Sequence, residues 1–246
     1  MVIHGMTDVG EVRKNNQDYF LIQVYDESNQ GFAVVCDGMG GAAAGNVASV
    51  LAADTFFAGF ENFRKDAMDN LYLQQNLQAA LDEANRAVFE KSVSDNQFAG
   101  MGTTLVCAVL QGTQLFALNV GDSRLYRISK DGIFKVTKDH SMVEELLLDG
   151  ILTEEQARRH PDRNIITRAV GTEKTVRCDF FKLELLPSEK VLLCSDGLSN
   201  VVDDAELQAA VCSGQPLNVI TENLIAAAKK RGAPDNVTVC ILDPAL

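Results

Sequence analysis

Five aspartates stand where apolar segments of this chain begin or end, and carboxylates so placed can bind a charged ligand. In FAVVCDGMGG, five small or apolar residues lead into Asp37 and then into three glycines. KVLLCSDGLSN repeats the pattern at Asp196. Asp122 follows the run QLFALNVG, Asp235 precedes NVTVCIL, and Asp18 precedes YFLIQV. Because strand interiors disfavour both Asp and Gly, these positions call for an explanation.

Each aspartate alone has an ordinary structural explanation, since Asp and Gly are turn formers. Five together are different, because like charges at one edge repel and raise one another's pKa unless a cation lies between them. Carboxylate and backbone carbonyl oxygens suit Mg²⁺ or Mn²⁺. Gly38, which lacks a Cβ, lets its carbonyl approach such an ion closely. The pattern therefore favours a divalent cation site, with simple turns as the alternative at each position.

Other catalytic chemistries lack their sequence signatures. The histidines His4, His140 and His160 and the cysteines show no spacing typical of zinc ligands, and His140 is expected to make a structural hydrogen bond. There is no GxSxG elbow, no GxxxxGK[ST] nucleotide loop, and no cysteine followed six positions later by arginine. This pattern points to hydrolysis by a metal-bound water. Arg13 is the candidate for binding a phosphate, since guanidinium groups contact phosphate oxygens in pairs; a solvated surface arginine is the alternative.

The composition excludes several classes of protein. The 246 residues carry 22 basic and 34 acidic side chains, a net charge of −12, so no nucleic-acid partner is expected. No apolar run approaches the roughly 18 residues of a membrane helix, and MVIHGMTDVG does not resemble a signal peptide. The six cysteines form no CxxC pair and lie mostly in apolar runs, which fits a reducing compartment. We therefore expect a cytoplasmic protein without a membrane partner.

The periodicity of apolar residues predicts the elements that must position the aspartates. Strands are predicted at 19–24, 32–36, 103–110, 114–121, 124–129, 133–137, 179–185, 190–194 and 236–242. Helices are predicted at about 45–60, 71–91, 203–212 and 216–230, with short helical pieces near 142–148 and 153–159. Strands and helices do not alternate one by one, so a doubly wound parallel sheet is disfavoured. We expect one domain over residues 1–246, an α+β four-layer α-β-β-α sandwich of two antiparallel sheets flanked by helix pairs.

Eight segments resemble, in order, motifs of the metal-dependent Ser/Thr protein phosphatases of type 2C: TDVGEVRKNNQD, VVCDGMGG, AGMGTTL, NVGDSR, KDHS, NIITRAVG, CSDGLSN and APDNVTV. The resemblance runs from Thr7 to about Leu242 and is closest to the short bacterial members that oppose eukaryotic-like Ser/Thr kinases. It implies a phosphatase that hydrolyses phosphoserine and phosphothreonine in proteins. We expect a monomer whose partners are such phosphoproteins, including a cognate Ser/Thr kinase.

The resemblance also implies a centre of two Mn²⁺ or Mg²⁺ ions. Carried over by position, Asp37 would bridge both ions, and Gly38 would give its carbonyl oxygen to one of them. Asp196 and Asp235 would hold the other ion. A water bridging the ions would attack phosphorus in line.

Three further roles follow from the resemblance. Asp18 would act on a metal through a bound water, and Asp122 with Asp196 would form a weaker site for a third ion. Arg13 would bind the substrate phosphate. Residues 140–168 would form the flap, a segment over the site that affects substrate choice.

Two positions depart from the family pattern. Bacterial members often carry His where Ala42 stands here, so a histidine general acid is in doubt and a metal-bound water is favoured in that role. Gln17 stands where many members carry Glu. Three alternatives remain open: a catalytically silent phosphoprotein-binding member, a phosphatase of an anti-sigma pathway, and a hydrolase of small phosphate esters. The intact set of Asp37, Asp196 and Asp235 favours an active enzyme.

Overall fold

The computed structural model describes residues 1–41, 44–158 and 160–244. Its strands are β1 (Val2–Asp8), β2 (Asp18–Tyr25), β3 (Gln30–Met39), β4 (Gly102–Thr103), β5 (Leu105–Gln111), β6 (Gln114–Val120), β7 (Arg124–Ser129), β8 (Gly132–Lys135), β9 (Asp179–Glu184), β10 (Lys190–Cys194) and β11 (Val237–Asp243). Its α-helices are α1 (Ala44–Phe63), α2 (Asn70–Ser94), α3 (Met142–Leu148), α4 (Glu154–Arg158), α5 (Asp196–Ser199), α6 (Asp204–Val211) and α7 (Leu217–Lys230). Two short 3-10 turns, η1 (Asp26–Ser28) and η2 (Asn96–Phe98), complete the set.

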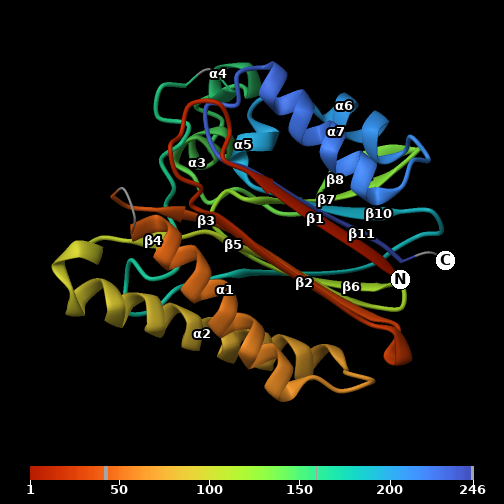
Figure 1. Cartoon of the computed structure of the whole chain (residues 1–246), viewed down its shortest axis with the longest axis horizontal. Coiled ribbons are helices and arrows are strands. Elements are labelled where there is room, and N and C mark those ends of the chain that lie inside the picture. The colour runs from red at the N-terminus through yellow and green to blue at the C-terminus, as the bar shows by residue number, and fades with distance from the viewer. Residues whose placement is uncertain (42–43, 159, 245–246) are drawn as a thin grey trace.

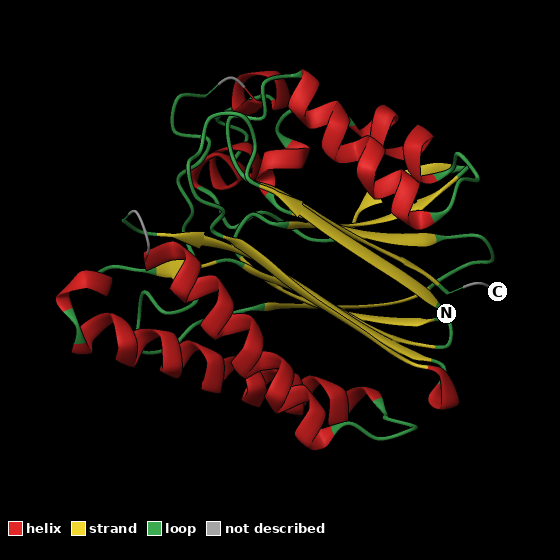
Figure 2. Ribbon diagram, in the orientation of Figure 1, coloured by secondary structure: helices red, strands yellow, loops and turns green. Residues whose placement is uncertain are grey.

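The strands form two antiparallel sheets that lie face to face (Figure 1). One sheet has the order β1-β11-β10-β7-β8, and the other has the order β2-β3-β5-β6-β9, with β4 added to the end of β3. Helices α1 and α2 cover the outer side of the second sheet, while α5, α6 and α7 cover the first (Figure 2). The predicted four-layer sandwich is therefore confirmed.

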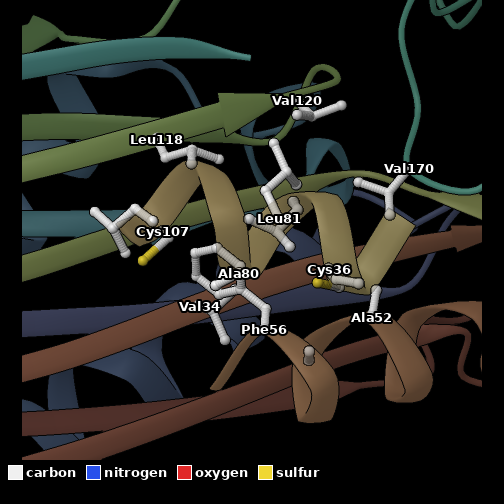
Figure 3. Packing of buried hydrophobic residues seen from close by; sticks show 14 of the residues in the cluster. Val34, Cys36, Ala52, Phe56, Ala80, Leu81, Cys107, Leu118, Val120 and Val170 are labelled. Carbon is white, nitrogen blue, oxygen red and sulfur yellow. The ribbon is translucent and has the colours of Figure 1, made fainter. Parts of the chain in front are cut away.

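Strand alternation divides the apolar side chains into an inner and two outer layers. On β3, Phe32, Val34 and Cys36 face helices α1 and α2, whereas Ala33 and Val35 face the opposite sheet. Figure 3 shows the outer layer, where side chains of α1 and α2 meet those of β3, β5 and β6. The inner layer between the sheets takes its residues from both of them. These three layers fix the two sheets rigidly against each other, so side chains at their shared edge are held at defined positions.

Most predicted elements are present, with three differences. Strand β1 has no predicted counterpart, because VIHGMTD mixes apolar, polar and glycine residues and its strand form depends on pairing with β11. The predicted strand 103–110 is interrupted at Thr104, whose backbone N–H donates to the carbonyl of Asp37. Asp196 starts the short helix α5, which the sequence patterns do not predict. In the described part of the chain, no helix is long and apolar enough to cross a membrane.

Candidate metal centre

Asp18 and Asp37 lie opposite each other on neighbouring strands at one edge of the inter-sheet space. The register of β2 and β3 pairs these two residues directly. Asp37 follows Ala33 and Val35 on the inward face of β3, so alternation turns its side chain toward the other sheet. Asp18 faces the same space. Phe20, two residues further along β2 and therefore on the same face, packs in the inner layer.

Asp18 is tied to the opposite sheet by two hydroxyl groups. Its Oδ2 accepts hydrogen bonds of 2.7 Å from Ser195 Oγ and 2.7 Å from Thr238 Oγ1. Ser195 directly follows β10, two residues beyond the inward-facing Leu193, and Thr238 lies on β11, two residues before the inward-facing Cys240. Sequence reasoning missed both hydroxyls, although the alternation of their strands could have found them. These bonds fix the orientation of a carboxylate that is only 5% exposed.

The backbone around Asp37 is held by the start of the next hairpin. Its N–H donates 2.9 Å to Thr104 Oγ1, and its carbonyl accepts from the backbone N–H of Thr104 and from Thr103 Oγ1. Gly38 packs against the first turn of α1, where a Cβ would stand 2.1 Å from the carbonyl oxygen of Gly45. A side chain at position 38 is therefore excluded, and the strand can pass close to the helix.

Asp196 and Asp235 come together because the two loops that carry them are in direct contact. At Gly197, a Cβ would stand 1.9 Å from the carbonyl oxygen of Asn236, so the start of α5 lies directly on the residue after Asp235. Asp196 Oδ2 accepts 3.0 Å from Asn200 Nδ2. Its other oxygen, Oδ1, is buried without a hydrogen-bond partner among the described residues. A buried carboxylate oxygen without a donor is costly and indicates a place for a positive ligand.

Asn236 fastens the loop that carries Arg13. Its Nδ2 donates 2.8 Å to Val9 O and 3.0 Å to Asn15 O, while its Oδ1 accepts 2.8 Å from the backbone N–H of Gln17. Both N–H groups and the carbonyl oxygen of this one amide are thus bonded to a single loop. The sequence patterns did not single out Asn236, because the signal is a contact between segments far apart in the chain.

Arg13 lies at the rim of the cluster and is paired with Asp235. Its Nη2 donates 2.7 Å to Asp235 Oδ2, and its side chain is 52% exposed. This hydrogen bond raises the pKa of Arg13, with further contributions from the charges of Asp37 and Asp196. A half-exposed guanidinium beside a group of carboxylates is placed to meet an incoming anion.

Asp122 lies two residues after the end of β6, near enough to Asp37 and Asp196 for their charges to interact. The residue that follows it, Ser123, shares a hydrogen bond of 2.7 Å with Thr104 Oγ1. The next residue, Arg124, makes a two-pronged ion pair with Asp139, at 2.7 Å for the shorter contact. Asp122 is thereby brought to the same edge as Asp37, whose backbone the same Thr104 holds.

The electrostatics confirm that the carboxylates form one cluster. The pKa of Asp37 is raised well above its usual range, mainly by burial. The charges of neighbouring carboxylates raise it further, in the order Asp18, Asp196, Asp122 and Asp235. Burial also raises the pKa of Asp18 to about 7 and that of Asp122 to about 8, and each is raised further by the charge of Asp196. For Asp196, burial and the charge of Asp235 raise the pKa to about 6. Carboxylates that resist ionisation together favour a bound cation.

The donor set fits divalent Mn²⁺ or Mg²⁺ better than other metals. Every candidate ligand is an oxygen, and one of them, Asp196 Oδ1, has no other partner in the described ranges. Within those ranges, no group of three His, Cys, Asp or Glu side chains is arranged to hold an ion on its own. Asp235 is engaged by Arg13, and Asp18 by the two hydroxyls. The site would therefore use carboxylates together with a backbone carbonyl and water.

The structure thus brings all the predicted site residues to one edge of the sandwich: Arg13, Asp18, Asp37, Gly38, Asp122, Asp196 and Asp235. Ala42, at the position discussed for a general acid, lies outside the described residues.

Comparison with known proteins agrees with this geometry. Residues 11–232 match the protein phosphatase 2C family. The chain is 35% identical to the serine/threonine phosphatase stp of Listeria innocua over 96% of this chain and 93% of that protein. It is also 35% identical to the protein phosphatase PhpP of Streptococcus pneumoniae over 98% and 97% of the two chains. The crystal structure of the serine/threonine phosphatase Stp1 from Staphylococcus aureus superposes with a TM-score of 0.90 at 35% identity, over 97% of this chain and 93% of that one.

Proposed function

The chain belongs to the protein phosphatase 2C family and is a protein serine/threonine phosphatase, and we propose that its aspartate cluster catalyses the hydrolysis with two bound divalent cations. The observation that carries this proposal is Asp196 Oδ1, a buried carboxylate oxygen with no hydrogen-bond partner among the described residues. It lies in a cluster in which burial and neighbouring carboxylate charges raise the pKa of Asp37 and of Asp196 itself. A divalent cation there removes both the unpaired oxygen and the repulsion.

The ligands divide between the two sheets. The side chains of Asp37, Asp196 and Asp235 and the carbonyl of Gly38 would together hold the two ions, with water completing their coordination. Mn²⁺ and Mg²⁺ both suit such an all-oxygen set. When bound, two such cations supply a water nucleophile at neutral pH and neutralise negative charge on the phosphoryl group.

Two further aspartates extend the centre. Asp18 is held by Ser195 and Thr238 at a fixed orientation and would help to hold an ion through a water. We assign Asp122, with Asp196, to a third and weaker cation site. Its raised pKa, of about 8, fits a carboxylate that needs a counter-charge before it ionises at neutral pH.

The protein's own cationic group binds the substrate. Arg13 extends its guanidinium from the loop that Asn236 fastens, and this group can hold two phosphoryl oxygens at once. Asp235 orients the guanidinium through the 2.7 Å contact. Arg13 therefore places phosphorus against the carboxylate cluster and neutralises charge that develops on its oxygens.

The substrates are phosphorylated proteins, and we propose that a cognate Ser/Thr kinase is among them. Residues 140–168 would act as a flap beside the site, within a single catalytic domain that works as a monomer. The six cysteines are all free thiols, and four of them are buried. This fits the proposed cytoplasmic location, since reducing conditions preserve free thiols.

The test is release of phosphate from a phosphothreonine peptide, first in excess chelator and then with Mn²⁺ added back. We expect activity to vanish in chelator and to return with Mn²⁺. Full activity in chelator would exclude the proposed metal mechanism. A chain that cleaves a small aryl phosphate with Mn²⁺ but leaves phosphopeptides intact would contradict the proposed substrate class.

A further inference from the structure

His140 contacts the residue before Asp122 with both its backbone and its ring. Its backbone N–H donates 2.9 Å to the carbonyl of Gly121. In return, the backbone N–H of Gly121 donates 3.0 Å to His140 Nδ1. The N–H and the carbonyl of Gly121 are thus both hydrogen-bonded to His140, which is only 6% exposed.

The position of Gly121 leaves little freedom for movement. Its φ is +103°, a conformation that L side chains rarely adopt, and a Cβ there would stand 2.6 Å from Thr104 Cγ2. On the other side of Asp122, the hydroxyl of Ser123 is bound to Thr104. Asp122 is therefore held between two fixed neighbours, and His140 supplies the contact that fixes the first of them.

The other ring nitrogen of His140 faces a charged pair. Because Nδ1 accepts from Gly121, the ring proton lies on Nε2, where Asp179 Oδ2 stands 3.3 Å away and Arg168 Nη1 stands 3.2 Å away. Asp179 Oδ1 accepts 3.0 Å from Arg168 Nη1. Burial, aided by the charge of Arg168, lowers the pKa of His140, so the ring is neutral and keeps this arrangement.

His140 also joins the two ends of the 140–168 segment. Its carbonyl accepts 2.8 Å from the backbone N–H of Thr167, and Met142 N–H donates 2.9 Å to Ile165 O. Ser141 and Ile166 form an isolated bridge between these two contacts. The base of the segment is therefore closed on itself, and its first residue rests on the loop of Asp122.

We propose that His140 is a positioning residue with two separable roles: through Nδ1 it holds Gly121 and thereby Asp122 at the metal centre, and through Nε2 it holds Asp179 and Arg168, the residue that ends the 140–168 segment. The first role rests on the proposed function of Asp122 as a cation ligand. The ordinary alternative is a buried histidine that contributes only to stability. The two ring nitrogens have different partners, so conservative substitutions can separate these possibilities.

The experiment measures Mn²⁺ binding by calorimetry and, separately, KM and kcat for a phosphothreonine peptide. Asp122→Ala first identifies the binding step that depends on Asp122. His140→Asn keeps an acceptor for the Gly121 N–H but loses the contact with Asp179. We expect it to retain Mn²⁺ affinity at that step within about threefold, while KM rises severalfold.

His140→Gln makes the opposite change in contacts. Its amide reaches toward Asp179 and leaves the Gly121 N–H without its acceptor. We expect the Asp122-dependent step to weaken by about tenfold or more, the usual effect of removing a partner that orients a ligand. KM then stays near the wild-type value. His140→Ala should show both defects. His4→Ala, a histidine on β1 bound to Thr221 and remote from the site, serves as the control and leaves both readouts unchanged.

The outcomes distinguish this inference from the metal assignment itself. If Asp37→Ala binds Mn²⁺ like the wild type, the proposed metal centre is wrong. If Asp37→Ala abolishes binding while all three His140 variants behave like the wild type, the positioning role is wrong. Equal losses of both readouts in the Asn and Gln variants, together with lower melting temperatures, would show a merely structural histidine and overturn the proposal.

Discussion

Replacing Asp18 by Asn should stabilise the protein in the absence of metal. Asp18 is 5% exposed, and burial, with the charges of Asp196 and Asp235, raises its pKa from 3.8 to about 7. The rise of about 3 pKa units corresponds to about 4 kcal/mol of unfavourable free energy once the group is ionised, as an upper limit. An asparagine keeps an oxygen that accepts from Ser195 and Thr238, so these hydrogen bonds survive the change.

The sign of the effect depends on pH in a defined way. Because the pKa of Asp18 is raised in the folded state, its stabilising contribution to the free energy of unfolding is complete below about pH 3.8. This contribution is lost as the pH rises through about 7. The advantage of Asp18→Asn should therefore be smaller at pH 5, where the penalty has only partly developed, and largest at pH 8. Part of the upper limit is offset by the new amide N–H₂ group, which needs a partner, so we expect a gain of about 2 kcal/mol at pH 8.

The assay is thermal and urea unfolding in chelator at pH 5 and pH 8. A gain of about 2 kcal/mol raises the melting temperature by about 4–8 °C in a domain of this size. Asp131→Asn, at an exposed turn, is the matched control and should shift stability by less than about 0.5 kcal/mol. Adding Mn²⁺ should favour the wild type over Asp18→Asn. A variant that is less stable than the wild type in chelator at pH 8 would refute this reasoning.

Three further predictions concern the site. Asp37→Ala or Asp196→Ala should lower phosphate release by about 10³-fold or more with unchanged circular dichroism, because each removes a proposed ligand; normal turnover in Asp37→Ala would exclude the two-ion assignment. Arg13→Ala should raise KM for a phosphothreonine peptide by about tenfold with a smaller effect on kcat, since it removes a paired phosphate contact; an unchanged KM would exclude that role. Gly197→Ala places a Cβ 1.9 Å from Asn236 O, so urea unfolding should show a loss of about 2 kcal/mol or more; an unchanged midpoint would contradict the close contact.

Strand alternation is enough to predict part of the site. The residues before Asp37 are small or apolar on both faces, and period two places its carboxylate on the same face as Ala33 and Val35. Gly38 was singled out because it lacks a Cβ, and the structure adds that a side chain at Gly38 or at Gly197 would meet a backbone carbonyl oxygen. These features are local, so they can be recognised in a single stretch of sequence.

The connections across the sandwich could not be predicted in the same way. Asn236, Ser195 and Thr238 act on residues about 180 to 230 positions away, so their partners depend on the register of strands that only the folded sheets define. Strand β1 was missed for the same reason, since its pairing with β11 and not its own pattern makes it a strand. Local patterns therefore find the candidate ligands, while tertiary pairing determines what orients them.

The place of β11 has a consequence for the timing of synthesis. This strand lies between β1 and β10, and Val2 pairs with Asp243. A ribosome releases β1 and Arg13 early, but Asp235 and Thr238 emerge only with the final segment of the domain. Until then, β1 has no strand to pair with in its own sheet, and its backbone hydrogen-bonding groups stay exposed. The insertion of β11 between β1, from the start of the domain, and β10, from near its end, therefore completes both this sheet and the proposed metal centre.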